Sequence, residues 1–166
     1  MRRGLLLIPL LCAGCLVPQD IEEMDPPRRG NDAPRIVLRT PAGTEVITQR
    51  GCQAVTFAVD QIEDFDAGDD VVVRWFVDWR PDDPTKAQED VIPGSPQIVD
   101  GVRGGSQLRL DPDDYPLGTL LVEAVVSDGF DPHPDAEPAN RAVLPGKDVD
   151  ETSWQLTITA ATECLQ

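Results

Sequence analysis

The chain has 166 residues and a formal net charge of −16, from 30 acidic and 14 basic residues. This length suits one domain with its own hydrophobic core. So much negative charge repels phosphate backbones, which argues against nucleic acid as a partner.

The chain begins with a basic and then apolar segment. Arg2 and Arg3 precede residues 4–18, which contain no charged side chain. As a helix these 15 residues would span roughly 22 Å, less than the ~30 Å hydrocarbon core of a bilayer, and Pro9 interrupts them. A basic start followed by a short apolar stretch is typical of a secretory signal peptide.

This apolar segment ends in the small residues Ala13 and Gly14, directly before Cys15. The junction resembles the lipobox of bacterial lipoproteins, although Cys12 stands where that motif usually has Leu. The resemblance implies that residues 1–14 are a removed signal and that Cys15 carries the lipid that anchors the chain to a membrane. Leu16, rather than Asp, follows the cysteine, which in this family favours the outer membrane of a Gram-negative cell envelope.

Residues 15–34 are expected to hold the lipidated cysteine and a disordered tether, with the folded domain at residues 35–166. The tether sequence is rich in proline and charge and has almost no periodic apolar pattern. A flexible chain of this length reaches on the order of 24 Å, enough for the domain to move above its membrane.

Two cysteines remain after signal removal and lipidation, Cys52 and Cys164. In an oxidising, exported compartment two such cysteines are expected to form a disulfide. The bridge would close a loop of more than 100 residues. The chain-entropy model gives such a loop about 4–5 kcal/mol of stabilisation.

From residue 35 onward, apolar and polar residues alternate as in strands with one buried face. The clearest strands are expected at 71–79, 120–129 and 154–160, and weaker ones at 35–39, 45–48, 52–59, 97–99 and 107–110. Turn residues rich in Pro, Gly and Asp separate them, and no long helical pattern occurs. Seven or eight short strands of this kind predict an all-β fold, an antiparallel β-sandwich.

The segments EDFDAGDDVVVRWFVD (63–78) and LDPDDYPLGTLLVEAVVSDGF (110–130) resemble immunoglobulin-like modules of the PKD and cadherin-like type. The resemblance implies an immunoglobulin-like sandwich with Trp75 in its core and Tyr115 near a tyrosine corner. In that topology the start of the second strand and the end of the last strand share a pole, which suits a bridge between Cys52 and Cys164.

Two acidic loops form a candidate calcium site. Asp64, Asp66 and Asp69 precede the strand at 71–79, while Asp128 and Asp131 follow the core of the strand at 120–129. A sandwich brings both loops to one pole, where carboxylates supply the oxygen ligands that Ca²⁺ prefers. The first loop does not fit an EF-hand. The alternatives are ordinary solvated turn residues or a patch for a cationic partner, and no other cofactor is expected.

The sequence gives little support for catalysis. His133 is the single histidine, no serine lies in a nucleophile-elbow motif, and no spare cysteine completes a zinc site. We expect His133 to be a solvated loop residue. The long connection at 130–151 carries an apolar patch at 142–144, which either folds back on the sandwich or meets a partner.

The sequence therefore predicts a lipid-anchored, non-catalytic envelope protein with a structural or protein-binding sandwich, bound to the membrane by its lipid and to another envelope or surface protein. One alternative is a calcium-stabilised adhesion or carbohydrate-binding module. The other is an enzyme or an enzyme's accessory domain.

Overall fold

The computed structural model describes residues 31–96 and 100–161, whose regular structure is almost entirely β-strand. The strands are β1 (Arg35–Thr40), β2 (Glu45–Gln49), β3 (Val55–Glu63), β4 (Val71–Val77), β5 (Gln88–Ile92), β6 (Val102–Arg103), β7 (Ser106–Leu110), β8 (Gly118–Ser127) and β9 (Val149–Thr159). One 3-10 helix, η1 (Pro112–Asp114), precedes β8. Within these described residues no helix has the length and apolar character needed to cross a membrane.

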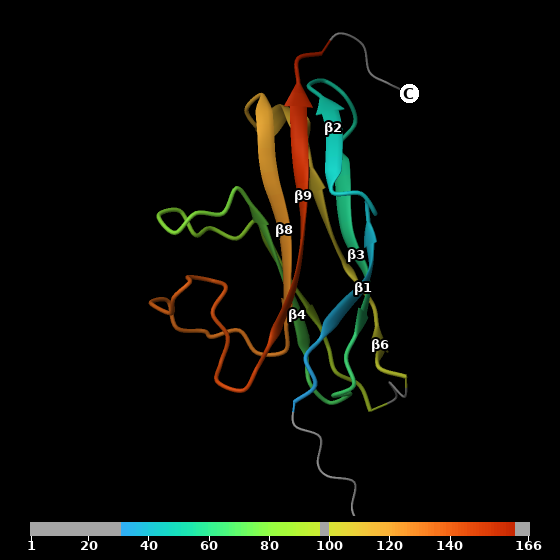
Figure 1. Cartoon of the computed structure of the whole chain (residues 1–166), viewed down its shortest axis with the longest axis vertical. Helices are drawn as coiled ribbons and strands as arrows, with labels where there is room; N and C mark the ends of the chain where they lie inside the picture. Colours follow the sequence, from blue (N-terminus) through green and yellow to red (C-terminus); the bar gives the residue numbers. More distant parts are fainter. Residues whose placement is uncertain (1–30, 97–99, 162–166) are drawn as a thin grey trace, which may run out of the picture.

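The strands form two sheets that run along the long axis of the molecule (Figure 1). One sheet has the order β1-β3-β6, with β7 also paired to β3, and the other has the order β2-β9-β8-β4-β5. All strand pairs are antiparallel except β2 and β9, which are parallel. The predicted all-β, immunoglobulin-like sandwich is therefore confirmed, with one parallel pair at its edge.

The chain changes sheets between β1 and β2. β1 pairs with β3 in the first sheet, and β2 then pairs with β9 in the second. The first half of this segment also contacts the last strand directly, because Ile36 N–H donates a 2.7 Å hydrogen bond to Asp150 Oδ2. The segment from β1 to β2 therefore forms an edge strand in each sheet and connects the two sheets.

The core lies between the sheets and is centred on three aromatic rings. Trp75 of β4 stacks on Trp154 of β9 with ring centroids 6.0 Å apart, and Phe57 of β3 lies 5.3 Å from Trp154. Trp75 Nε1 donates a 2.7 Å hydrogen bond to Ser106 Oγ on β7, which links the two sheets. The remaining buried core residues are Val59, Ile62, Val71, Val73, Leu108, Leu110, Leu120, Val122, Ala124, Val126, Leu156 and Ile158.

Tyr115, expected near a tyrosine corner, follows η1 and packs against this core. Its carbonyl oxygen accepts a 2.7 Å hydrogen bond from Arg50 Nη2, which ties the β7–β8 connection to the turn after β2. Burial, with a smaller effect of Asp114, raises the pKa of the Tyr115 phenol above its ordinary value.

The connection between β8 and β9 folds back on the outer face of the second sheet. Phe130 bridges to Val143, and both pack with Phe76 and Val125 in a second apolar cluster. Of the two alternatives for the apolar patch at 142–144, the structure shows the first, since Val143 belongs to this cluster.

The strand boundaries correct several predictions. β3 occupies Val55–Glu63 instead of 52–59, so Cys52 lies in the turn before it. β9 begins at Val149, five residues before its expected start, because the polar stretch at 149–153 pairs with β8. β5 and β6 lie where the sequence predicts no strand, and the expected strand at 97–99 lies outside the described residues.

Candidate functional site

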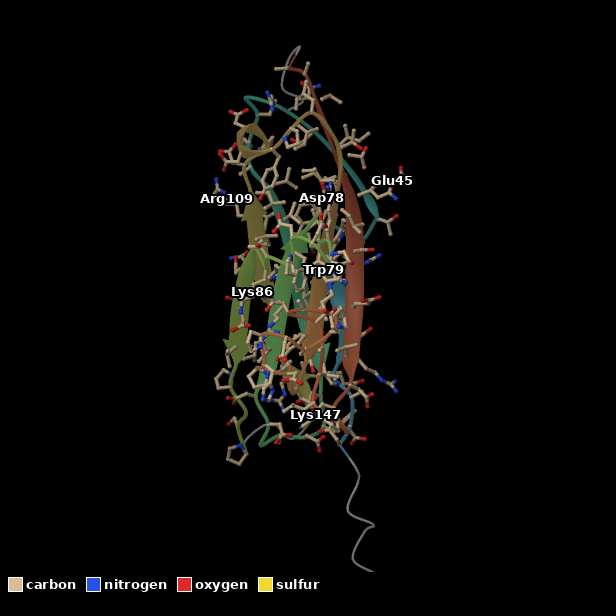
Figure 2. The ribbon with its side chains drawn as sticks, turned by 90° about the vertical axis from the view of Figure 1, so that its left-hand side faces the viewer. Glu45, Asp78, Trp79, Lys86, Arg109 and Lys147 are labelled. Carbon is tan, nitrogen blue, oxygen red and sulfur yellow. The ribbon has the colours of Figure 1, made fainter. Side chains whose placement is uncertain are left out.

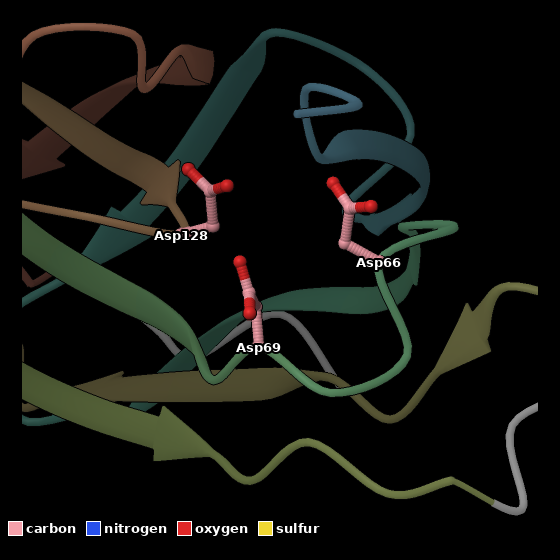
Figure 3. Close-up of side chains that lie close together, drawn as sticks. All are labelled: Asp66, Asp69 and Asp128. Atoms are coloured by element: carbon pink, nitrogen blue, oxygen red, sulfur yellow. The ribbon is translucent and has the colours of Figure 1, made fainter. Parts of the chain in front are cut away.

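The loop between β3 and β4 and the residues that follow β8 meet at one end of the sandwich. We call this end, formed by residues 64–70 and 128–131, the acidic pole. The side chains of Asp66, Asp69 and Asp128 lie close together there (Figure 3). Each offers a carboxylate oxygen, and these oxygens all lie within 4.8 Å of one another. The predicted convergence of the two loops is therefore present for these three residues.

A lysine of the chain itself occupies this group of carboxylates. Lys147 Nζ lies 2.8 Å from Asp69 Oδ2 and 2.9 Å from Asp128 Oδ2, and the Asp128 side chain is fully buried. Burial alone would lower the pKa of Lys147, but the hydrogen bonds to Asp69 and Asp128 outweigh it and raise that pKa. The ammonium therefore remains charged and supplies the cation that the cluster needs.

Asp64 does not join the three carboxylates. Its side chain and that of Arg103 from β6 are both fully buried and form an ion pair of 2.7 Å. Burial raises the pKa of Asp64, while hydrogen bonding from Asp66 N–H and the charge of Arg103 oppose that rise. A carboxylate enclosed in this way is a structural group and has no free face for a ligand.

Arg103 also shapes the acidic loop. Its guanidinium donates hydrogen bonds of 2.6 Å to the carbonyl oxygens of Asp66 and Asp69. One side chain therefore holds Asp64 by charge and fixes the backbone on which Asp66 and Asp69 stand. This bidentate, planar geometry is characteristic of arginine and is not available to lysine.

Asp131, the fifth residue of the predicted calcium set, also lies outside the cluster. Its Oδ1 accepts hydrogen bonds from His133 N–H at 2.9 Å and from the His133 ring at 2.6 Å. These bonds lower the pKa of Asp131. The His133 side chain is 72% exposed, so the expectation of a solvated loop histidine is met by its position.

The structure also contains a site that the sequence did not suggest, a cationic clamp on the long β8–β9 connection. Arg141 lies 4.5 Å from the ring centres of both Phe76 and Trp79 and pairs with Glu123 at 2.5 Å. Arg74 lies 4.1 Å from the Phe130 ring and donates a hydrogen bond to the Asn140 carbonyl oxygen. These contacts hold the connection on the sheet. Figure 2 views this side of the molecule.

The residues that the sequence reasoning missed are thus basic: Lys147, Arg103, Arg141 and Arg74. One signal was present, because Lys86 and Lys147 are the two lysines among 166 residues. In a chain with 30 acidic residues, each of these lysines is a candidate counter-charge for a cluster of carboxylates. Its partners nevertheless lie 19 and 78 residues away in the chain, and no local pattern points to them.

Of the two cysteines of the expected disulfide, Cys52 belongs to the described residues. Cys52 lies in the turn after β2, and it is not a free thiol in the structure. Arg50 N–H in the same turn donates a 3.1 Å hydrogen bond to the Thr159 carbonyl oxygen, so this turn lies beside the end of β9. Cys164 lies outside the described residues, as does Cys15, and the Cys52–Cys164 pairing remains a prediction.

Comparisons with known proteins give no family for the chain. No protein-family model matches it, and no curated protein matches it. Among solved structures it is similar to AggA, the major subunit of aggregative adherence fimbriae type I from Escherichia coli, with a TM-score of 0.32 and 12% sequence identity over 79% of this chain and 97% of that chain. At this TM-score the likeness carries no argument about function.

Proposed function

We propose that the protein is a lipid-anchored component of a bacterial cell envelope whose β-sandwich is a non-catalytic structural or protein-binding module. The anchor is placed at Cys15, in the outer membrane of a Gram-negative cell. The support for the anchor is the Ala13-Gly14-Cys15 junction after a short apolar segment. The disulfide proposed between Cys52 and Cys164 belongs to the same exported state.

The main support for a non-catalytic function is that charged groups of the acidic pole form ion pairs within the chain. Arg103 neutralises Asp64, and Lys147 contacts both Asp69 and Asp128. Groups held in this way rigidify loops and are poorly placed to exchange protons with a substrate. The His133 imidazole is mostly exposed and pairs with Asp131, which fits a surface loop better than a general base.

A cleavage and labelling experiment tests the anchor. Cells fed a labelled fatty acid should incorporate the label into the wild-type chain, and the processed protein should fractionate with the outer membrane. The Cys15→Ser variant should lose the label and appear as an unprocessed or soluble form, whereas Cys12→Ser should keep it. A membrane-bound wild-type chain that is cleaved but carries no lipid would refute the proposed anchor.

A crosslinking experiment tests the binding module. Photo-crosslinkers placed on the exposed β-strand surface of the anchored protein should capture the same envelope protein from several neighbouring positions. The same crosslinker variants without irradiation serve as the control and should capture nothing. Turnover of a substrate by the purified protein, abolished by His133→Ala, would instead support an enzyme.

A second candidate, the calcium-stabilised adhesion or carbohydrate-binding module, has one observation in its favour. Asp128 Oδ1 is buried and has no hydrogen-bond partner among residues 31–96 and 100–161. Against it stands Lys147, which already contacts the other oxygen of Asp128. A cation would have to displace this ammonium, and we therefore rank the module without calcium first.

A further inference from the structure

The four residues before β1 contact the acidic pole. We call residues 31–34 the strap. Asp32 N–H donates a 2.6 Å hydrogen bond to Asp66 Oδ2, and Asn31 Oδ1 accepts one of 2.6 Å from Lys147 Nζ. Pro34 is buried, in contrast to an extended, solvated linker. The sequence predicts that residues 31–34 belong to the flexible tether, whereas their contacts make them part of the sandwich.

Lys147 connects the strap to two other segments. An ammonium has three hydrogen-bond donors and no acceptor. Lys147 uses them on Asn31 of the strap, Asp69 of the β3–β4 loop and Asp128 after β8, at 2.6, 2.8 and 2.9 Å. Its position is therefore set by three partners from three separate parts of the chain.

The stem of the lysine is also held in place. A Cβ atom added at Gly129 would lie 2.6 Å from Lys147 Cγ, closer than real Cβ contacts allow. The absence of a side chain at residue 129 therefore leaves the space through which the lysine reaches the carboxylates. An alanine there would push the lysine stem away without changing any charge.

We propose that the strap fixes the point at which the N-terminal segment leaves the sandwich, and that Lys147 locks it there. Loss of the ammonium removes the contact with Asn31 and leaves Asp69 and Asp128 without their shared cation. The strap then keeps the bond from Asp32 to Asp66, but its link to Lys147 is lost.

The consequence for the anchored protein rests on the function proposed above. With the lipid at Cys15, the chain enters the sandwich at the strap, and the acidic pole is the end of the sandwich nearest the anchor. The opposite pole, with the turn after β2 and the end of β9, is then the end presented away from the membrane (Figure 1). The strap itself does not depend on the lipid.

Amide hydrogen exchange in the detergent-solubilised full-length protein tests the strap. In the wild type the Asp32 amide should be protected. In Lys147→Gln and in Gly129→Ala its exchange should be about tenfold faster, the change expected when one hydrogen bond to a charged group is lost. Lys86→Gln, which removes the other lysine from its pairing with Glu89, is the matched control and should leave the Asp32 amide unchanged.

A second variant covers the case in which Lys147→Gln fails to fold. Asn31→Ala leaves Lys147 paired with both carboxylates but removes the same bond from the ammonium to the strap, so it should also speed exchange of the Asp32 amide by about tenfold. The proposal is refuted if the Asp32 amide is unprotected in the wild type. It is also refuted if this amide exchanges at the wild-type rate in every variant that folds among Lys147→Gln, Gly129→Ala and Asn31→Ala. A protected Asp32 in a chain that incorporates no fatty acid would refute the anchor and leave the strap in place.

Discussion

Trp75 and Trp154 stack with their ring planes at 20° although β8 lies between their strands. Trp75 pairs in register with Ala124 of β8, whereas Trp154 pairs with Val122. The methyl group of Ala124 leaves room for two indoles to meet above the middle strand. The centre of the core thus depends on a large residue on β4 and on β9, Trp75 and Trp154, and on the small residue Ala124 on β8 between them.

Truncation of this stack should be costly. Trp154→Ala removes a fully buried ring that contacts both Trp75 and Phe57, and we expect a loss of about 3–5 kcal/mol in the free energy of unfolding. Urea unfolding followed by far-UV circular dichroism measures it. The neighbouring exposed substitution Gln155→Ala should change stability by less than about 0.5 kcal/mol. Similar values for the two variants would contradict the packing described for the core.

Overpacking gives the complementary prediction. Ala124→Leu keeps the residue apolar but adds volume where the indoles meet, and it should cost about 1–3 kcal/mol. The change in near-UV circular dichroism should exceed that of Gln155→Ala, since the ring geometry itself is disturbed. A neutral Ala124→Leu variant would show that the rings do not meet over β8.

The buried pair of Asp64 and Arg103 should give a distinctive pH dependence. Arg103→Met leaves the Asp64 carboxylate buried without its partner, and a loss of about 3–5 kcal/mol is expected at neutral pH. The pKa of Asp64 already lies above its ordinary 3.8 in the folded protein because of burial, and loss of the guanidinium should raise it further.

The sign follows from proton binding. Because the folded pKa of Asp64 lies above 3.8, the folded state keeps this proton at pH values at which the unfolded state has lost it. The contribution of Asp64 to stability therefore falls as pH rises through its folded pKa. Arg103→Met should therefore be less destabilising at pH 5 than at pH 7. A loss that is constant with pH would indicate that Asp64 stays ionised in the variant. Arg109→Met, on the exposed face of β7, is the control.

The strands with strict alternation were predictable, and those stabilised by distant partners were not. β4 and β8 are central strands whose core-facing apolar residues alternate along the sequence, so their own residues specify them. β5, with the sequence QEDVI, is a polar edge strand. Its own residues do not indicate a strand, and it forms one by pairing with β4. The acidic pole behaves similarly, since its acidic residues are visible in the sequence while Lys147 reaches them only after folding.

The cationic clamp should control the long β8–β9 connection. Arg141→Ala removes the contacts with Phe76, Trp79 and Glu123, and we expect about 1–3 kcal/mol of destabilisation together with faster amide exchange across residues 131–147. Arg141→Lys should recover only part of the loss, because lysine lacks the planar fork that stacks on rings. Exchange in β3, on the other sheet, should stay unchanged. Unaltered exchange in the connection would show that Val143 and Phe130 hold it alone.

The predicted disulfide has a mass signature. Alkylation of the exported protein without reductant should modify neither Cys52 nor Cys164, and both should react after reduction. Loss of the bridge in Cys164→Ser should lower stability by about 4–5 kcal/mol in the chain-entropy model. Labelling of both thiols in the unreduced protein would contradict the pairing.

The role of Lys147 leads to a prediction about calcium. The wild type should show no selective change in melting temperature with millimolar Ca²⁺, because an ammonium already contacts Asp69 and Asp128. Ca²⁺ takes six to eight oxygen ligands, and Asp64 and Asp131 are held by Arg103 and His133. Lys147→Met should be less stable than the wild type, since three carboxylates within 4.8 Å then repel one another without a counter-charge.

In this variant a divalent cation can take the place of the ammonium. Ca²⁺ at a hundredfold excess over its dissociation constant would restore about 2.7 kcal/mol, a rise of several degrees in melting temperature. Mg²⁺ at equal ionic strength separates binding from screening, and Lys86→Met controls for the loss of a lysine. A calcium-selective rise in the wild type, abolished by Asp66→Asn or Asp128→Asn, would overturn this prediction. It would also place the calcium-stabilised module ahead of the function proposed here, because the ammonium would then be shown to yield to the ion.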